Sequence, residues 1–166
     1  MKKEKGIVIR RAKKSDSEAI WEILKSVISA GDTYAFAPDS PKKELLEYWF
    51  AKDNHVYVAT QDKRVIGTFY IRDNQPGLAS HVANAAYAVS PAERGKGIGK
   101  MMGEYSLVEA KRLGYQAMQF NLVVKTNTAA VELWKSLGFR IVGEIAKAFK
   151  HKELGEVSAY IMHRFL

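Results

Sequence analysis

Residues 89–100 read Val-Ser-Pro-Ala-Glu-Arg-Gly-Lys-Gly-Ile-Gly-Lys. A strand-like run, 82–89, leads into this stretch, and a helical pattern follows it. Glycines let backbone N–H groups converge without side-chain interference, and the start of a helix adds partial positive charge. Arg94, Lys96 and Lys100 add cations. The stretch therefore predicts a cradle for a phosphate-bearing ligand, although a glycine-rich turn that only packs a helix closely against a sheet has the same pattern.

Two other nucleotide-binding patterns are excluded by their spacing. A P-loop needs Gly-x-x-x-x-Gly-Lys followed by Ser or Thr, whereas Lys100 is followed by Met101. A dinucleotide-binding fingerprint that begins at Gly97 would have its last glycine, Gly103, one position late. It would also need an acidic residue about 20 residues farther on, where residues 121–122 are Asn and Leu.

Hydrophobic periodicity on both sides of this stretch outlines the rest of the fold. Runs typical of strands occupy 7–9, 55–60, 65–71, 82–89, 117–124, 139–145 and 157–163; helical patterns begin at Ser15, Ser40 and Gly97, and a fourth, short one ends at Gly138. This order of elements predicts an α/β fold whose mixed sheet has helices on both faces. The strand–helix–strand crossover over 82–124 predicts a parallel, right-handed connection.

Local patterns add finer expectations about single elements. Ser15 and Glu18 fit a capping box, which predicts that the first helix begins at Ser15. Residues 147–156 are expected to form a polar loop between the last two strands. The helix from Gly97 is expected to turn one apolar face inward, made of Ile98, Met101, Met102, Tyr105 and Val108.

Composition bounds the class of protein. The chain has 166 residues and no cysteine, which predicts a single domain over 1–166 and excludes disulfides, thiolate metal sites and a cysteine nucleophile. No apolar run approaches a membrane span and no signal segment is evident, so a cytoplasmic protein is expected. The four histidines lack the clustering of a metal site. The formal net charge of +8 attracts anions, including nucleic acid and phosphorylated cofactors.

Three motifs then point to one family. Arg94-x-x-Gly97-x-Gly99 lies between a strand and a helix, Asn127 opens the next helix, and that helix ends in Leu-Gly-Phe at 137–139. In this order and spacing they resemble the GNAT superfamily of acyl-CoA-dependent N-acyltransferases, with a likeness over roughly residues 82–145. The resemblance implies a mostly antiparallel mixed sheet with splayed middle strands, and acetyl-CoA as cosubstrate. It places Tyr87, Ala88 and Val89 beside the pantetheine arm, Arg94, Gly95, Lys96, Gly97, Ile98, Gly99 and Lys100 around the diphosphate, and Asn127 and Trp134 against the cofactor from the next helix.

A fainter resemblance concerns the acceptor of the acetyl group. Phe-Asn-Leu-Val at 120–123 and Gly-Asp-Thr-Tyr-Ala-Phe at 31–36 resemble the branch that contains fungal acetyltransferases of proline-like amino acids. The acceptor-side residues that it implies are Tyr34, Phe36, Asn84 and Asn121. Amides orient a substrate but are poor bases, and an Asn in an apolar strand can equally make an internal hydrogen bond. The loop aromatics can form a lid or simply cover the core.

Acetyl transfer from a thioester needs few protein groups. Direct attack requires no enzyme nucleophile, but the amine must lose a proton because its pKa is near 10. The backbone N–H of Val89 is expected to stabilise the charge on the reacting carbonyl oxygen. Members of the superfamily commonly use a tyrosine as acid and a carboxylate as base, where this chain has Trp134, and Ala83 and Asn84. The catalytic residues are therefore predicted as Asn84, Asn121 and Val89, with water as the base, and Trp134 is expected to pack rather than to donate a proton.

The sequence thus predicts transfer of an acetyl group from acetyl-CoA to the amine of a small molecule, such as an amino acid or an amine-bearing toxin. Its partner is that small-molecule amine, with no metal and no membrane, and the resemblance leaves a homodimer open. A protein N-terminal or lysine acetyltransferase is an alternative that needs an open groove. The missing acid and base suggest a non-catalytic acyl-CoA-binding protein as another. Nucleic-acid binding is disfavoured, because no platform of aromatic and basic residues accompanies the charge.

Overall fold

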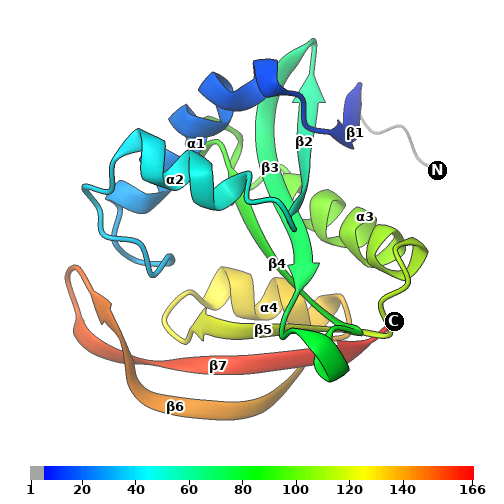
Figure 1. Ribbon diagram of the computed structural model, residues 1–166. Coiled ribbons are helices and arrows are strands. Elements are labelled where there is room, and N and C mark those ends of the chain that lie inside the picture. The colour runs from blue at the N-terminus through cyan, green and yellow to red at the C-terminus, as the bar shows by residue number, and fades with distance from the viewer. Residues whose placement is uncertain (1–5) are drawn as a thin grey trace.

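The computed structural model describes residues 6–166. Within them, seven strands form one mixed sheet in the order β1-β2-β3-β4-β5-β7-β6, and helices cover both of its faces (Figure 1). The strands are β1 (Ile7–Arg11), β2 (His55–Gln61), β3 (Arg64–Asp73), β4 (Val82–Val89), β5 (Ala117–Val124), β6 (Arg140–His151) and β7 (Gly155–Phe165). The helices are α1 (Ser17–Ser29), α2 (Lys42–Trp49), α3 (Ile98–Arg112) and α4 (Thr128–Ser136), with short 3-10 turns at Lys14–Asp16, Gly77–Ala79 and Pro91–Glu93.

The sheet divides between its central strands β4 and β5. These two parallel strands pair only where they begin, at Val82–Ala117 and Ala83–Met118, and diverge beyond that point (Figure 1). The other neighbouring strands of the described sheet are antiparallel. The predicted mixed, mostly antiparallel sheet with splayed middle strands is confirmed, as is the parallel crossover through α3. The divergence leaves the later part of β4 with one main-chain edge that β5 does not cover.

Each face of the sheet carries its own hydrophobic core. On one face α1 and α2 pack against β2–β4, and Leu24 and Trp49 are almost fully excluded from solvent. On the other face α3 and α4 enclose Phe69 and Met118. Burial of a side chain of this size contributes roughly 1.5–3 kcal/mol. Packing on both sides therefore holds β4 in place although β5 leaves it.

The first helix begins later than predicted. α1 starts at Ser17 rather than at Ser15, because Asp16 caps the 3-10 turn before it. The Asp16 carboxylate accepts from the Lys13 N–H at 2.7 Å and from the Arg10 guanidinium at 2.8 Å. Asp16 thus accepts from the main-chain N–H that opens the 3-10 turn and pairs with an arginine, and the predicted capping box of Ser15 and Glu18 is not formed.

The inward face of α3 also differs from the prediction. Tyr105 and Val108 are exposed, and the buried side of the helix includes Glu109 instead. This carboxylate accepts from the Tyr57 hydroxyl and the Arg112 guanidinium, each at 2.7 Å. Because the charge is paired, its burial is tolerated, and periodicity of apolar residues alone could not identify that face.

The last two strands form a longer hairpin than expected. β6 extends to His151 and β7 begins at Gly155, so the predicted polar loop over 147–156 is wrong and most of it is strand. Lys147 has a φ of 53°, and the register with β7 shifts there, which marks a bulge that bends the hairpin. Exposed polar side chains hid these strands from a hydrophobicity pattern. The extension carries the tip of the hairpin to the loop between α1 and α2, where the Lys152 N–H donates to the Gly31 carbonyl at 3.0 Å.

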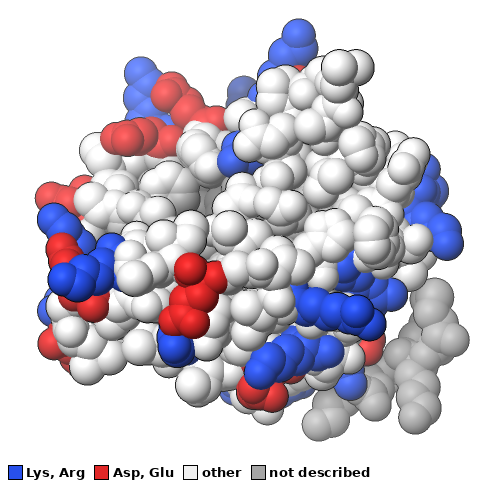
Figure 2. All heavy atoms as spheres, turned by 90° about the horizontal axis from the view of Figure 1, so that it is seen from below, with Lys and Arg blue, Asp and Glu red and all other residues white. Residues whose placement is uncertain are grey.

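Surface charge is mixed on the face shown in Figure 2. Lysine and arginine side chains lie mainly toward its rim, acidic side chains lie beside many of them, and much of the surface between is uncharged. The net charge of +8 is therefore not gathered into one patch on this face. None of the helices in residues 6–166 is long and apolar enough to cross a membrane.

Candidate functional site

The turn between β4 and α3 presents an uninterrupted row of main-chain donors. The N–H groups of residues 95–100 have no acceptor among residues 6–166, since the first main-chain bond into α3 runs from Met101 N to Gly97 O. Gly95 and Gly97 have φ values of +74° and +82°, and a Cβ at either would meet no atom within 4 Å. The row is therefore open on its outer side, in a left-handed conformation that glycine adopts readily. Converging donors at a helix start bind phosphate groups.

Two cations beside the row remain for an anionic ligand. Arg94 is exposed and has no partner among the described residues, and Lys100 makes only a 3.9 Å contact within its own helix. Lys96 instead pairs with the buried Glu93, with 2.9 Å between Nζ and Oε2. This contact, with Arg64 at the other oxygen, holds the pKa of Glu93 below its usual range. Glu93 thus anchors the turn as an anion, and Lys96 is engaged there rather than free.

Beyond the point where β5 diverges, every second residue of β4 has its main-chain N–H and C=O at the open edge of the strand. Ser90 N donates to Ile66 O of β3 at 2.9 Å, so the even-numbered residues of this antiparallel pair bond to β3 and the odd-numbered ones point away from it. The N–H groups of Tyr87 and Val89 therefore face the open edge, where no described strand pairs with them. Ala88, also predicted to bind the cofactor, has its main-chain groups on the β3 side.

The loop between α1 and α2 reaches this edge through Tyr34. Its hydroxyl donates to the Tyr87 carbonyl. Burial raises the pKa of Tyr34 well above its usual range, so the hydroxyl keeps its proton. Phe36 packs on Tyr34 and on Tyr48, with ring centroids 6.5 and 4.9 Å apart. The loop thus both covers the core beside α2 and contacts the open edge.

Trp134 of α4 and Asn127, the residue before that helix, lie beside the same opening. Trp134 is 9% exposed, and its ring centroid is 4.8 Å from that of Tyr87 and 4.7 Å from that of Phe120, which supports the expected packing role. Asn127 caps the helix, because its Oδ1 accepts from the Ala130 N–H at 3.3 Å. Its Nδ2 has no partner among residues 6–166 and remains a free donor.

The two predicted strand asparagines already have partners. Asn84 Oδ1 accepts from the N–H of the next residue, Ala85, at 2.7 Å. Asn121 is exposed, donates to Asn74 Oδ1 at 2.7 Å and accepts from Gln119 Nε2 at 3.0 Å. Their contact with an acceptor stays a prediction.

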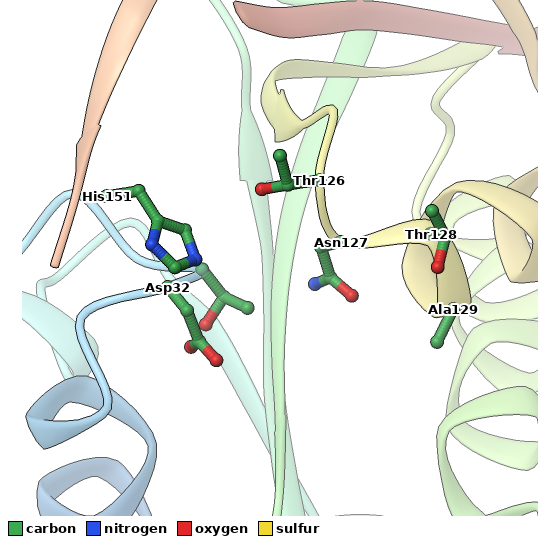
Figure 3. Close-up of a pocket in the computed structure, with 7 residues that line it drawn as sticks. Asp32, Thr126, Asn127, Thr128, Ala129 and His151 are labelled. Atoms are coloured by element: carbon green, nitrogen blue, oxygen red, sulfur yellow. The ribbon is translucent and has the colours of Figure 1, made fainter. Parts of the chain in front are cut away.

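A polar cavity of about 170 Å³ lies where three segments meet (Figure 3). It is lined by Asp32 and Thr33 from the α1–α2 loop, by Thr126, Asn127, Thr128 and Ala129 from the β5–α4 turn and by His151 from the β6–β7 hairpin. Pockets for drug-sized ligands typically measure roughly 300–1,000 Å³, so this one suits a smaller molecule. Among residues 6–166 no three His, Cys, Asp or Glu side chains group as a metal site requires.

Sequence reasoning missed this cavity. The resemblance implies that Asp32 lies in a loop that shapes acceptor specificity, but it assigns this residue no contact, and the sequence indicates His151 only as an unclustered histidine. The long hairpin brings His151 to the loop, and the pattern of residues 147–156 gave no signal that the two last strands extend so far. The polar Gly-Asp-Thr at 31–33, directly after a helix, was the one available hint.

Comparison with known proteins identifies the family. Residues 19–139 match the model of the acetyltransferase (GNAT) family. The chain belongs to this family. Among relatives, N-acetyltransferase aca1 of Schizosaccharomyces pombe is 42% identical over 98 residues, which are 58% of this chain and 47% of aca1. The chain therefore spans about half the length of that relative.

Solved GNAT structures share the architecture. A GCN5-related N-acetyltransferase from Kribbella flavida is 38% identical, with a TM-score of 0.93 over 97% of this chain and 98% of that one. The yncA protein of Salmonella typhimurium, solved with its cofactor acetyl-CoA, is 23% identical, with a TM-score of 0.84 over 97% and 94% of the two chains. Both scores show that these chains share the fold described above.

Proposed function

We propose that this GNAT protein is an N-acetyltransferase that moves the acetyl group of acetyl-CoA to the amine of a small molecule. The observation that carries the proposal is the row of free N–H groups at 95–100, beside the opening between β4 and β5. A diphosphate is recognised by converging main-chain donors together with a cation. The row and Arg94 offer both, so the residues present fit the diphosphate of coenzyme A.

The rest of the cosubstrate site follows the open edge of β4. The N–H groups of Tyr87 and Val89 face that edge, and Asn127 Nδ2 is a free donor on its other side. We assign the pantetheine arm to these groups, with Trp134 packed beside it. Acetyl-CoA supplies a reactive thioester, so the chain needs no nucleophile of its own. The Val89 N–H is assigned to the carbonyl oxygen, where negative charge develops.

β4 has no carboxylate that could accept the proton of the amine, because residues 82–89 contain neither Asp nor Glu. We assign the loss of the amine proton to water. Asn84 and Asn121 are kept as orienting groups, since a neutral amide binds polar groups but takes up no proton. Tyr34 is a protonated donor at the open edge, and Trp134 has an indole N–H that can donate a hydrogen bond but does not give up its proton as a phenol does.

The geometry favours a small acceptor over a protein. The hydrogen bond between Lys152 and Gly31 joins the hairpin to the α1–α2 loop, and the residues next to it, Asp32 and His151, line a cavity of about 170 Å³. A protein N-terminus or lysine would need an open groove. The single domain and the cytoplasmic location expected from the sequence stay predictions, and the resemblance to the family leaves a homodimer open.

Binding and turnover of the purified protein test the proposal. Calorimetry with acetyl-CoA is expected to give one site per chain, and thiol release is expected with free amino acids or other small amines. Peptides with a free N-terminus or an internal lysine are expected to be poor acceptors. Faster turnover of a peptide would favour the protein acetyltransferase, binding without turnover on any amine would favour a non-catalytic acyl-CoA-binding protein, and absence of binding would contradict the proposal.

A further inference from the structure

The cavity between the α1–α2 loop, the β5–α4 turn and the β6–β7 hairpin holds polar groups that the rest of the protein leaves unpaired. The Asp32 carboxylate makes no hydrogen bond or ion pair with any described residue. Thr33 Oγ1 is buried and has no hydrogen-bond partner in residues 6–166. A buried hydroxyl without a partner costs about 1–3 kcal/mol. A polar ligand that pairs with these groups would therefore be bound favourably.

The turn after His151 determines which nitrogen of its ring can donate a hydrogen bond to that ligand. Its Nδ1 accepts from the main-chain N–H groups of Glu153 and Leu154, at 3.1 and 3.2 Å. A ring nitrogen that accepts two hydrogen bonds carries no proton, so the neutral ring has its proton on Nε2. His151 is then a hydrogen-bond donor through Nε2 and is not placed to act as a base there.

An acceptor and a donor share one wall of the cavity, and a second donor lies on the opposite wall. Figure 3 shows Asp32 and His151 on one wall and Asn127 on the other, with the amide nitrogen of Asn127 turned toward the space between them. Asp32 is an anion that attracts an ammonium group and His151 donates to an oxygen, whereas the Asn127 amide is already assigned to the pantetheine arm. A molecule that satisfies both Asp32 and His151 carries an amine and, a few atoms away, an oxygen acceptor.

The cavity also adjoins the edge of β4 assigned to the acetyl group. Tyr34, two residues after Asp32, donates to the Tyr87 carbonyl on that edge, and Asn127 is common to the cavity and the assigned cosubstrate site. An amine held at Asp32 would therefore lie near the assigned position of the thioester.

We propose that this cavity is the acceptor site, in which Asp32 binds the ammonium group and His151 Nε2–H donates to a carboxylate or carbonyl oxygen of the same small molecule. The inference rests on the proposed function and deepens it: the acceptor is a small amino acid or a close analogue. Asp32 and His151 act as specificity-determining residues.

Matched variants test the two roles. Asp32→Asn keeps the shape and removes the charge, and Asp39→Asn, in the same loop but outside the cavity, is its control. His151→Asn keeps an acceptor for the turn at the place of Nδ1 but removes the cavity donor, whereas His151→Gln offers an amide N–H near the place of Nε2. The probes are acetyl-CoA and a panel of L-amino acids, each paired with the amine that lacks its carboxylate.

The expected result is a change in acceptor recognition alone. Asp32→Asn should raise the acceptor KM roughly tenfold or more for every amine, and Asp39→Asn should not. His151→Asn should raise KM for the amino acids but not for the matched amines, and His151→Gln should restore part of the loss. The Kd of acetyl-CoA should stay within about twofold in all variants.

Two negative outcomes separate the inference from the proposed function. If the wild-type protein acetylates small amines while Asp32→Asn and His151→Asn keep its acceptor KM, the cavity is not the acceptor site and only the inference falls. If the wild-type protein acetylates no amine, the proposed function falls and the inference falls with it.

Discussion

The main-chain N–H of Lys152 donates to the carbonyl of Gly31, with 3.0 Å between nitrogen and oxygen. This bond connects two segments that belong to opposite halves of the split sheet, the loop after α1 and the tip of the β6–β7 hairpin (Figure 1). Asp32 and His151, the neighbours of the bonded residues, line the cavity beside it. The two halves of the sheet diverge at β4 and β5 and are joined again here, which gives the cavity its fixed walls.

Gly31→Ala should weaken this connection. Gly31 has a φ of +63°, and a Cβ there would lie 2.9 Å from Lys152 Cβ. A left-handed alanine alone costs roughly 1–2 kcal/mol. Gly77→Ala is the matched control, since Gly77 has a φ of +61° with no atom near its Cβ. Chemical denaturation should show a larger loss of unfolding free energy for Gly31→Ala, together with a raised acceptor KM; equal losses would mean that the contact with Lys152 yields without cost.

Arg94→Glu should abolish recognition of the diphosphate. The variant places an anion beside the N–H row and removes a charge-assisted hydrogen bond, so the Kd of acetyl-CoA should rise roughly 100-fold. Calorimetry measures the Kd directly, and the thermal stabilisation by acetyl-CoA should vanish in parallel. Arg140→Glu makes the same change of charge at an exposed residue of β6, the edge strand in the other half of the split sheet, and should behave as the wild type. An unchanged Kd for Arg94→Glu would mean that the diphosphate lies elsewhere.

Thr33→Val should weaken binding of the acceptor without lowering the unfolding free energy. The valine keeps the shape and removes a buried hydroxyl that has no partner among the described residues. The unfolding free energy of the free protein should therefore stay the same or rise by about 1 kcal/mol, while the acceptor KM rises several-fold. Thr60→Val is the control, because the Thr60 hydroxyl donates to the Val8 carbonyl at 3.2 Å and its removal should cost about 1 kcal/mol. A comparable loss of stability in Thr33→Val would show that its hydroxyl is satisfied in the free protein.

Acid should destabilise the fold through Glu109. Hydrogen bonds from Arg112 hold the pKa of this carboxyl at about 2, below its ordinary value of 4.5. A carboxyl with a lowered pKa in the folded state stabilises the fold at pH values above its unfolded pKa, and this contribution is lost as pH falls from about 4.5 toward 2. The difference corresponds to at most about 3 kcal/mol.

Denaturation at a series of pH values measures this contribution. Between about pH 5 and pH 2 the wild type should lose more unfolding free energy than Glu109→Gln, which cannot ionise. Glu104→Gln, exposed on the same helix, should follow the wild type. Parallel curves for the wild type and Glu109→Gln would show that the ion pair with Arg112 contributes nothing to the pH dependence.

Elements with a strong hydrophobic periodicity, or with glycines that mark where they end or begin, were predictable from the sequence. β4 and β5 have the bounds that their apolar runs indicated, and the glycines at 95–99 marked the turn before α3. The wrong details have physical causes. On α3, Glu109 is buried because Arg112 and Tyr57 compensate its charge, and a hydrophobicity pattern cannot show such pairing.

The acceptor side was less predictable because it depends on contacts between distant segments. Asp32 and His151 come together only because β6 and β7 extend far enough to reach the loop after α1. The strand asparagines were visible in the sequence, but their partners Ala85, Asn74 and Gln119 were not. The cofactor turn is local in the chain, and a local motif could therefore identify it.

Backbone amide NMR of residues 95–100 tests the central claim most directly. Acetyl-CoA should shift these six N–H resonances together, because each donates to no described acceptor in the free protein, while S-acetyl-pantetheine, which lacks the diphosphate, should leave them in place. If saturating acetyl-CoA leaves the six resonances unchanged, the turn after β4 does not bind the diphosphate and the assignment of the cosubstrate site is wrong.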